Sequence, residues 1–121
     1  MIERALVADD ENLSREFLKD ALESLGIEAV AVPDGEAALR MTGEKDFDHV
    51  VTDMRMPKLD GTGLLKKLRA KGCDTPVVIV TAFGTVESAV EAMREGADDF
   101  LHKPFSVDQI EVLLETLEKR R

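Results

Sequence analysis

The sequence of 121 residues contains no tryptophan, no tyrosine and only one cysteine, Cys73. A single cysteine excludes a disulfide framework and suits a reducing compartment such as the cytoplasm. Aromatic residues make up 4% of the chain, so platforms on which nucleic-acid bases could stack are scarce. Basic residues number 16 against 25 acidic ones, and the net charge of -9 repels phosphate backbones. We therefore expect no direct binding of nucleic acid by this chain.

Long apolar runs are also missing from the sequence. No run approaches the roughly 18 residues needed to span a membrane, and no signal peptide opens the chain. Linkers, low-complexity tracts and internal repeats are absent as well, while hydrophobic residues reach 44%, enough to close one core. We therefore expect a single domain over residues 1–121 that is cytoplasmic and does not enter a membrane.

Five short apolar runs alternate with stretches whose apolar residues recur at helical spacing. The runs, each a predicted strand, are residues 5–8, 30–32, 50–52, 77–80 and 100–101. Glycines that can adopt a left-handed conformation are expected to follow the helical stretches and end them. These glycines are Gly26, Gly43, Gly72 and Gly96. Asp60 is expected to cap the helix it precedes, and Ser106 with Gln109 has the form of a capping box before the last helix.

Strands that alternate with helices predict a parallel sheet with helices on both faces. The run at 77–80 is apolar throughout, as in a strand covered on both sides, whereas the run at 30–32 ends at Pro33 and suits a sheet edge. The predicted fold is α/β, a flavodoxin-like (βα)5 doubly wound five-stranded parallel sheet. For its strand order we adopt 2-1-3-4-5, the order of known folds of this kind, which places the second strand at an edge.

Polar residues with one consistent chemistry follow four of the predicted strands. They are Asp9, Asp10, Asp53, Thr81 and Lys103. In the order 2-1-3-4-5 they converge at the switch point of the sheet, where sites form. Two unit charges about 5 Å apart repel by roughly 3 kcal/mol at an effective dielectric of about 20, which a divalent cation bound by oxygens, Mg²⁺, would offset. Phosphate commonly completes such a site, so the set predicts phosphoryl transfer, with Asp53 as nucleophile and Lys103 and Thr81 at the phosphoryl oxygens.

Five segments of the sequence, in order along nearly the whole chain, resemble the receiver domain of two-component response regulators. They are residues 7–11, 51–57, 60–61, 80–82 and 100–105. The resemblance implies that Asp53 is the phosphoacceptor. It also implies that Mg²⁺ is bound by Asp10, Asp53 and the backbone carbonyl of Arg55, with Asp9 acting mainly through water.

The same resemblance implies roles for the ends of the fourth and fifth strands. Lys103 matches the lysine that pairs with the phosphoryl group, and the Lys103–Pro104 bond is often cis in such domains. Thr81 and Phe100 match a switch pair, in which Thr81 moves toward the phosphoryl group and Phe100 turns inward behind it. The change is expected to reach the fourth helix, the fifth strand and the fifth helix. Val107 and Val112 add apolar surface to that last helix, which favours a homodimer or output-domain contact there.

Residues 81–93 are similar to receivers of the NtrC-like enhancer-binding activators, in which an ATPase domain and a DNA-binding domain follow. Neither domain is present here, so the chain is expected to be the excised N-terminal domain of a longer transcriptional regulator. A stand-alone receiver that acts by protein–protein binding stays open. The expected partners are a sensor histidine kinase and the output domain. We expect no enzyme activity beyond assistance to the chain's own phosphorylation and dephosphorylation.

Two side chains depart from the common pattern, and three other functions are disfavoured by the residues. Arg55 and Phe83 lie two residues after Asp53 and Thr81, at positions that, as the resemblance implies, influence the lifetime of the phosphoryl group. A charged and a bulky group there are expected to restrict the attacking water, so we expect slow self-dephosphorylation. An aspartyl-phosphate phosphatase of the haloacid-dehalogenase kind would need an acid where Arg55 stands. A flavodoxin-like flavin binder is disfavoured because the acidic pair at 9–10 repels phosphate in the absence of a metal. A scaffold that is never phosphorylated is disfavoured by the intact acid and lysine set.

Overall fold

Five parallel strands form one sheet in the order β2-β1-β3-β4-β5 in the computed structural model, which describes residues 3–82 and 84–119. The strands are β1 (Arg4–Ala8), β2 (Glu28–Val32), β3 (His49–Asp53), β4 (Val77–Thr81) and β5 (Asp99–His102). The helices between and after them are α1 (Asn12–Ser24), α2 (Gly35–Glu44), α3 (Gly61–Ala70), α4 (Val86–Arg94) and α5 (Val107–Lys119). The predicted fold class and strand order are confirmed.

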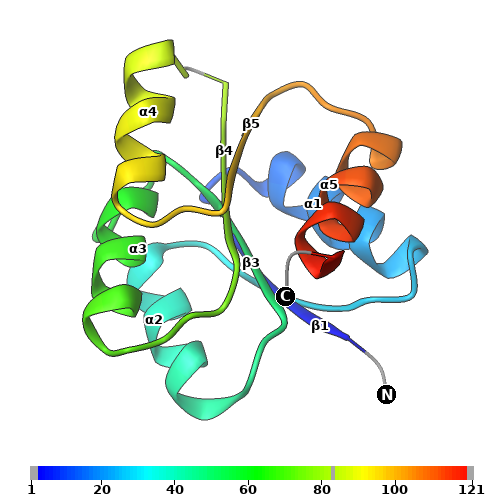
Figure 1. Cartoon of the computed structure of the whole chain (residues 1–121). Coiled ribbons are helices and arrows are strands. Elements are labelled where there is room, and N and C mark those ends of the chain that lie inside the picture. Colours follow the sequence, from blue (N-terminus) through cyan, green and yellow to red (C-terminus); the bar gives the residue numbers. More distant parts are fainter. Residues whose placement is uncertain (1–2, 83, 120–121) are drawn as a thin grey trace.

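The helices cover both faces of the sheet, with α1 and α5 on one face and α2, α3 and α4 on the other (Figure 1). Each face has its own hydrophobic core. Leu18 and Leu22 of α1 meet Ile110 of α5 on the first face, while Leu64 and Leu68 of α3 fill the second. Since apolar stripes at helical spacing face the sheet from both sides, the central strands are apolar on both faces as well.

The central and edge strands differ in burial as their sequences predict. Every residue of β4 is buried, because helices lie above and below it. In β2, which pairs only with β1 among the described residues, Glu28 is exposed and two further residues are only partly buried. The edge position predicted for this strand is therefore confirmed.

Most predicted helix boundaries are confirmed, with one error. Asp60 accepts a hydrogen bond from the Gly63 N–H at 2.7 Å, and the capping box before α5 is present in both directions. Three of the four predicted terminating glycines have positive φ values, Gly26, Gly72 and Gly96. Gly43 is the exception, because it lies within α2, which continues to Glu44. A glycine in a helix interior costs about 1 kcal/mol relative to alanine, which tertiary packing tolerates. None of the helices described is both long and apolar enough to cross a membrane.

Strand register brings the ends of four strands to one edge of the sheet. Ala8 pairs with Thr52, Asp53 pairs with Val80, and the residues that follow these strands emerge together. The Lys103 N–H donates to the carbonyl of Thr81 at 2.9 Å, which fixes the start of the β5–α5 loop. The Lys103–Pro104 peptide bond in this loop is cis, as expected.

Candidate active site

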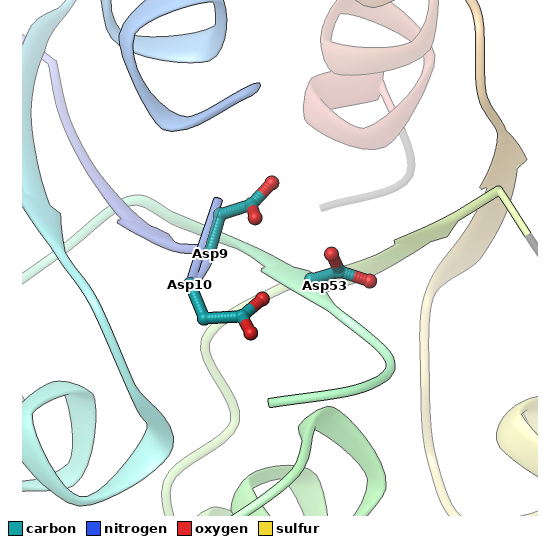
Figure 2. A group of neighbouring side chains, drawn as sticks. All are labelled: Asp9, Asp10 and Asp53. Carbon is teal, nitrogen blue, oxygen red and sulfur yellow. The ribbon is translucent and has the colours of Figure 1, made fainter. Parts of the chain in front are cut away.

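Three carboxylates meet at this edge of the sheet. Asp9 and Asp10 follow β1 and Asp53 ends β3, and one oxygen from each lies within 4.8 Å of the others. Figure 2 shows the three side chains close together where the two strands end. Asp9 is fully buried, Asp53 is partly buried and Asp10 is exposed. The structure thus brings together the three acids that the sequence placed at the switch point.

The ammonium group of Lys103 lies against two of these acids. Its Nζ is 2.9 Å from Asp9 Oδ2 and 3.2 Å from Asp53 Oδ2, and its side chain is 18% exposed. It also donates to the hydroxyl of Ser14 at 2.6 Å. Each of the three ammonium protons therefore has an acceptor in the described part of the chain.

The charges of the site shift two pKa values. Burial raises the pKa of Asp53 above its ordinary value; the neighbouring Lys103 opposes this rise and the charge of Asp9 adds to it. Burial alone would lower the pKa of Lys103, but its hydrogen bond to Asp9 and the charges of Asp53 and Asp9 outweigh burial and raise it. Lys103 therefore stays protonated at neutral pH, while Asp53 is ionised at a cost.

Asp9 organises the start of α1 as well as the site. Its Oδ1 accepts from the Glu11 N–H at 3.0 Å, and its carbonyl accepts from the Arg15 guanidinium at 2.8 Å. Its Oδ2 accepts from both Ser14 and Lys103. The N-cap of α1 is Glu11, whose side chain forms no capping hydrogen bond. Asp9 therefore orders the residues that lead into α1 and belongs to the acidic site, but it is not a helix cap.

Thr81 and Phe100 both lie beside Gly84, in the connection between β4 and α4. Thr81 ends β4 and is fully buried, and Phe100 of β5 packs against the core under α3 and α4. A Cβ atom added to Gly84 would lie 2.8 Å from two atoms of the Phe100 ring and 2.9 Å from the Thr81 methyl. The glycine therefore keeps room for a tight contact between the loop and both members of the predicted switch pair.

Arg55 is exposed, and its N–H donates to Asp53 Oδ1 at 3.4 Å. Phe83, the second residue in the prediction of slow self-dephosphorylation, lies outside the described residues. Gly61 packs directly on the end of β3, since a Cβ there would come 2.2 Å from the Asp53 carbonyl oxygen. The sequence motif contained Gly61, but the need for a glycine depends on this backbone contact.

Ser14 is the site residue that sequence reasoning missed. Its hydroxyl donates to Asp9 Oδ2 at 2.5 Å while it accepts from Lys103. A signal was present in the sequence, because Ser14, Leu18 and Leu22 recur every four residues on the same face of α1. A hydroxyl on the buried stripe of an amphipathic helix predicts a polar partner underneath.

An apolar groove borders the site on the side of Lys103. It has a volume of about 300 Å³ and is lined by Leu13, Ser14, Phe17, Lys103, Pro104 and Phe105. The rings of Phe17 and Phe105 meet edge to face, with centroids 5.9 Å apart. Leu13 is 78% exposed and Phe17 43%, so the groove presents apolar surface to solvent next to the acids.

Comparison with known proteins assigns the chain to a family. Residues 5–115 match the family described as the response regulator receiver domain. The regulatory protein AtoC of Escherichia coli (strain K12) is 39% identical over 114 residues, which cover 94% of this chain and 25% of AtoC. The chain spans from about a quarter to about half of the length of such curated relatives.

Solved structures agree with the sequence match. The receiver domain of the Francisella response regulator 1452 is 39% identical, with a TM-score of 0.91 over 98% of each chain. The receiver domain of a sensor histidine kinase from Pseudomonas aeruginosa PAO1, described with a magnesium ion coordinated in its active-site cleft, is 27% identical, with a TM-score of 0.86 over 96% of this chain and 97% of that one. Because sequence and structure match over nearly its whole length, the chain belongs to the receiver domains of two-component response regulators, whose signalling depends on phosphorylation.

Proposed function

We propose that Asp53 accepts a phosphoryl group from a sensor histidine kinase in a Mg²⁺-dependent step and that the chain passes the resulting change to an output domain. The observation that carries this proposal is the placement of Lys103 between Asp9 and Asp53 at the switch point of the sheet. A carboxylate nucleophile, a fixed cation and further oxygens for a metal are the parts that phosphoryl transfer needs.

The residues present fit a magnesium ion. The donor set is three carboxylates with oxygens within 4.8 Å of one another, and oxygen-only sites with room for waters suit Mg²⁺. Asp10, Asp53 and the backbone carbonyl of Arg55 would hold the ion, with Asp9 acting through water. A bound Mg²⁺ would supply positive charge to offset that of the phosphoryl oxygens. The related receiver domain from Pseudomonas, which is described with this ion, supports the assignment.

The residues of the chain carry the rest of the reaction. A carboxylate oxygen of Asp53 attacks the phosphorus of a phosphohistidine on the kinase. The new O–P bond forms as the P–N bond breaks, and the electron pair of that bond stays on the imidazole nitrogen. Lys103 holds positive charge beside the phosphoryl oxygens, and the hydroxyl of Thr81 donates to one of them. The product is an acyl phosphate on Asp53 and a free histidine, so the chain assists its own modification without turnover of another substrate.

The apolar groove beside Lys103 is the proposed docking surface for the kinase. A phosphohistidine can reach Asp53 only if the donor protein covers the rim of the acidic site. Leu13 and Phe17 of α1 and Phe105 of the β5–α5 loop form that rim on the Lys103 side, and their exposed apolar surface would be buried in the complex.

The opposite end of the site leads to the proposed output surface. Val86, Val90 and Met93 recur at helical spacing on α4 and are exposed, and Val112 of α5 is 62% exposed. We assign α4, β5 and α5 to contact with an output domain or with a second copy of the chain. In a longer cytoplasmic regulator the output would be transcriptional, through an ATPase domain and a DNA-binding domain, which agrees with the similarity to AtoC over a quarter of that protein.

A single mass measurement tests the core of this proposal. The protein is incubated with Mg²⁺ and acetyl phosphate, and the intact mass is recorded. The wild type should gain one phosphoryl group that is stable in acid and labile in base, whereas Asp53→Asn and protein in a chelator should gain none. Uptake that is equal in the wild type and in Asp53→Asn would show that Asp53 is not the acceptor.

A further inference from the structure

The hydroxyl of Ser14 completes the surroundings of the Lys103 ammonium. It accepts from Lys103 Nζ at 2.6 Å, the shortest of the three contacts of that group, since Asp9 lies at 2.9 Å and Asp53 at 3.2 Å. Ser14 also gives its own proton to Asp9 Oδ2. The three groups therefore form a closed set of hydrogen bonds, in which the serine links the buried acid to the lysine.

We propose that Ser14 is a positioning residue for phosphorylation, acting through Lys103 to hold its ammonium over the phosphoacceptor. The inference rests on the proposed function of Asp53 and Lys103. An ammonium on a flexible four-carbon chain has rotamer freedom that must be restricted before it can aid transfer. Asp9 and Ser14 accept two of its protons, which leaves the third for Asp53 Oδ2.

During transfer the contact to Asp53 is the one that must change. As Asp53 becomes an acyl phosphate, its carboxylate loses its negative charge in the new O–P bond, and the phosphoryl group brings its own negative charge into the site. The third proton of Lys103 then turns from Asp53 to the phosphoryl oxygens. The other two protons can stay on Asp9 and Ser14, so the ammonium needs little reorganisation. Without the hydroxyl, one proton of Lys103 and one lone pair of Asp9 lose their partner, and the lysine samples other positions.

A pair of nearly isosteric variants isolates the hydroxyl. Ser14→Thr keeps the oxygen and adds a methyl group, and Ser14→Val has the same shape as threonine without the oxygen. The added methyl can be accommodated because Ser14 lines an open groove of about 300 Å³. Both variants are β-branched and so cost the helix similar amounts, which makes threonine the matched control for valine.

Two measurements compare the Ser14→Thr and Ser14→Val variants with the wild type. The first is the rate of phosphorylation by acetyl phosphate with saturating Mg²⁺. We expect Ser14→Val to react about fivefold more slowly than the wild type, equivalent to about 1 kcal/mol, and Ser14→Thr to stay within about twofold. The second needs neither metal nor reaction: the side-chain ammonium signal of Lys103 in nitrogen-15 NMR should be resolved in the wild type and in Ser14→Thr and lost to hydrogen exchange in Ser14→Val.

The affinity for Mg²⁺ separates positioning from distortion. We expect it to stay within about twofold in both variants, because the metal carboxylates keep their places. Equal rates and equal ammonium signals in the two variants would overturn the inference. So would a parallel loss of Mg²⁺ affinity and rate in Ser14→Thr as well as Ser14→Val, because that pattern marks a displaced helix. If the wild type itself takes up no phosphoryl group, the proposed function fails and this inference fails with it, a result distinct from a phosphorylated wild type with indifferent variants.

Discussion

Removing the charge of Asp53 should stabilise the folded protein in the absence of metal. Burial raises the pKa of this carboxyl above the ordinary value of 3.8, so the ionised side chain is less favourable in the folded state than in the unfolded chain. The Asp53→Asn variant keeps the shape and an acceptor oxygen for Lys103 but carries no charge. We expect its free energy of unfolding to exceed that of the wild type at neutral pH.

The size of the effect follows from the distances in the site. At an effective dielectric of about 20, an acid within 4.8 Å repels Asp53 by at least about 3 kcal/mol, and Lys103 at 3.2 Å attracts it by about 5 kcal/mol. The exposed Asp10 adds a repulsion that solvent reduces. The charges therefore nearly cancel, and burial decides the sign. We expect Asp53→Asn to be more stable than the wild type by about 1 kcal/mol.

The pH dependence of the stability difference between Asp53→Asn and the wild type tests the same argument independently. Since the pKa of Asp53 is raised in the folded state, its unfavourable contribution is complete above the folded value and vanishes below the unfolded one. The advantage of Asp53→Asn should therefore be full at about pH 7 and disappear as the pH falls below about 4. Urea denaturation followed by circular dichroism in a chelator measures it, because the chain has no Trp or Tyr for fluorescence.

The control for this experiment removes an acid outside the site. Asp20 is exposed on α1, and Asp20→Asn should change the free energy of unfolding by less than about 0.5 kcal/mol. If Asp53→Asn is less stable than the wild type at neutral pH, or if its advantage is the same at every pH, then the charge of Asp53 does not destabilise the folded state and the argument from burial is wrong.

Three further predictions concern metal, loop and backbone contacts. Mg²⁺ at about 100 times its dissociation constant should raise the free energy of unfolding of the wild type by about 2.7 kcal/mol; Asp10→Asn, at the same concentration in the same urea titration, should gain much less. Arg69 donates to the carbonyls of Cys73 and Gly96, and Arg69→Ala should lose about 2–3 kcal/mol in chemical denaturation, with Arg69→Lys failing to restore it because lysine lacks the planar fork. A loss below about 0.5 kcal/mol would contradict that role. Gly61→Ala, which places a methyl group against the backbone of Asp53, should lower both the melting temperature and the uptake of phosphoryl groups; unchanged values of both would show that the loop yields without cost.

The sequence predicted those parts of the fold that repeat a simple pattern. The residues of β4 are apolar without interruption because helices cover both faces, so the strand was found at nearly its full length. At the sheet edge the signal is weaker, and the predicted run at 30–32 missed Glu28 and Ala29 of β2. The acids after the strands were found because their placement follows from strand order alone.

Features that depend on contacts between distant segments were less accessible. Gly43 was expected to end a helix, but a glycine gives the same signal in a helix interior as at a helix end, and only packing decides between them. The contact of Gly61 with the backbone of Asp53 and that of Ser14 with Lys103 join residues that lie apart in the sequence. Neither contact leaves a periodic trace, although a serine on the buried face of α1 is a hint of one.

The way in which α4 is attached explains how a small change at Asp53 could have a large effect. Among the described residues of α4, only Ala92 is buried, so the helix is held by little apolar area and can be moved at low cost. Its C-terminal end is fixed, because Arg69 of α3 bonds Gly96 and pairs with Asp98 at 3.1 Å. Its N-terminal end follows the loop that packs on Thr81 and Phe100. A shift of Thr81 toward a phosphoryl group would therefore move the N-terminal end of α4 while Arg69 holds the C-terminal end in place. The helix would change its orientation, and its exposed apolar residues would move with it.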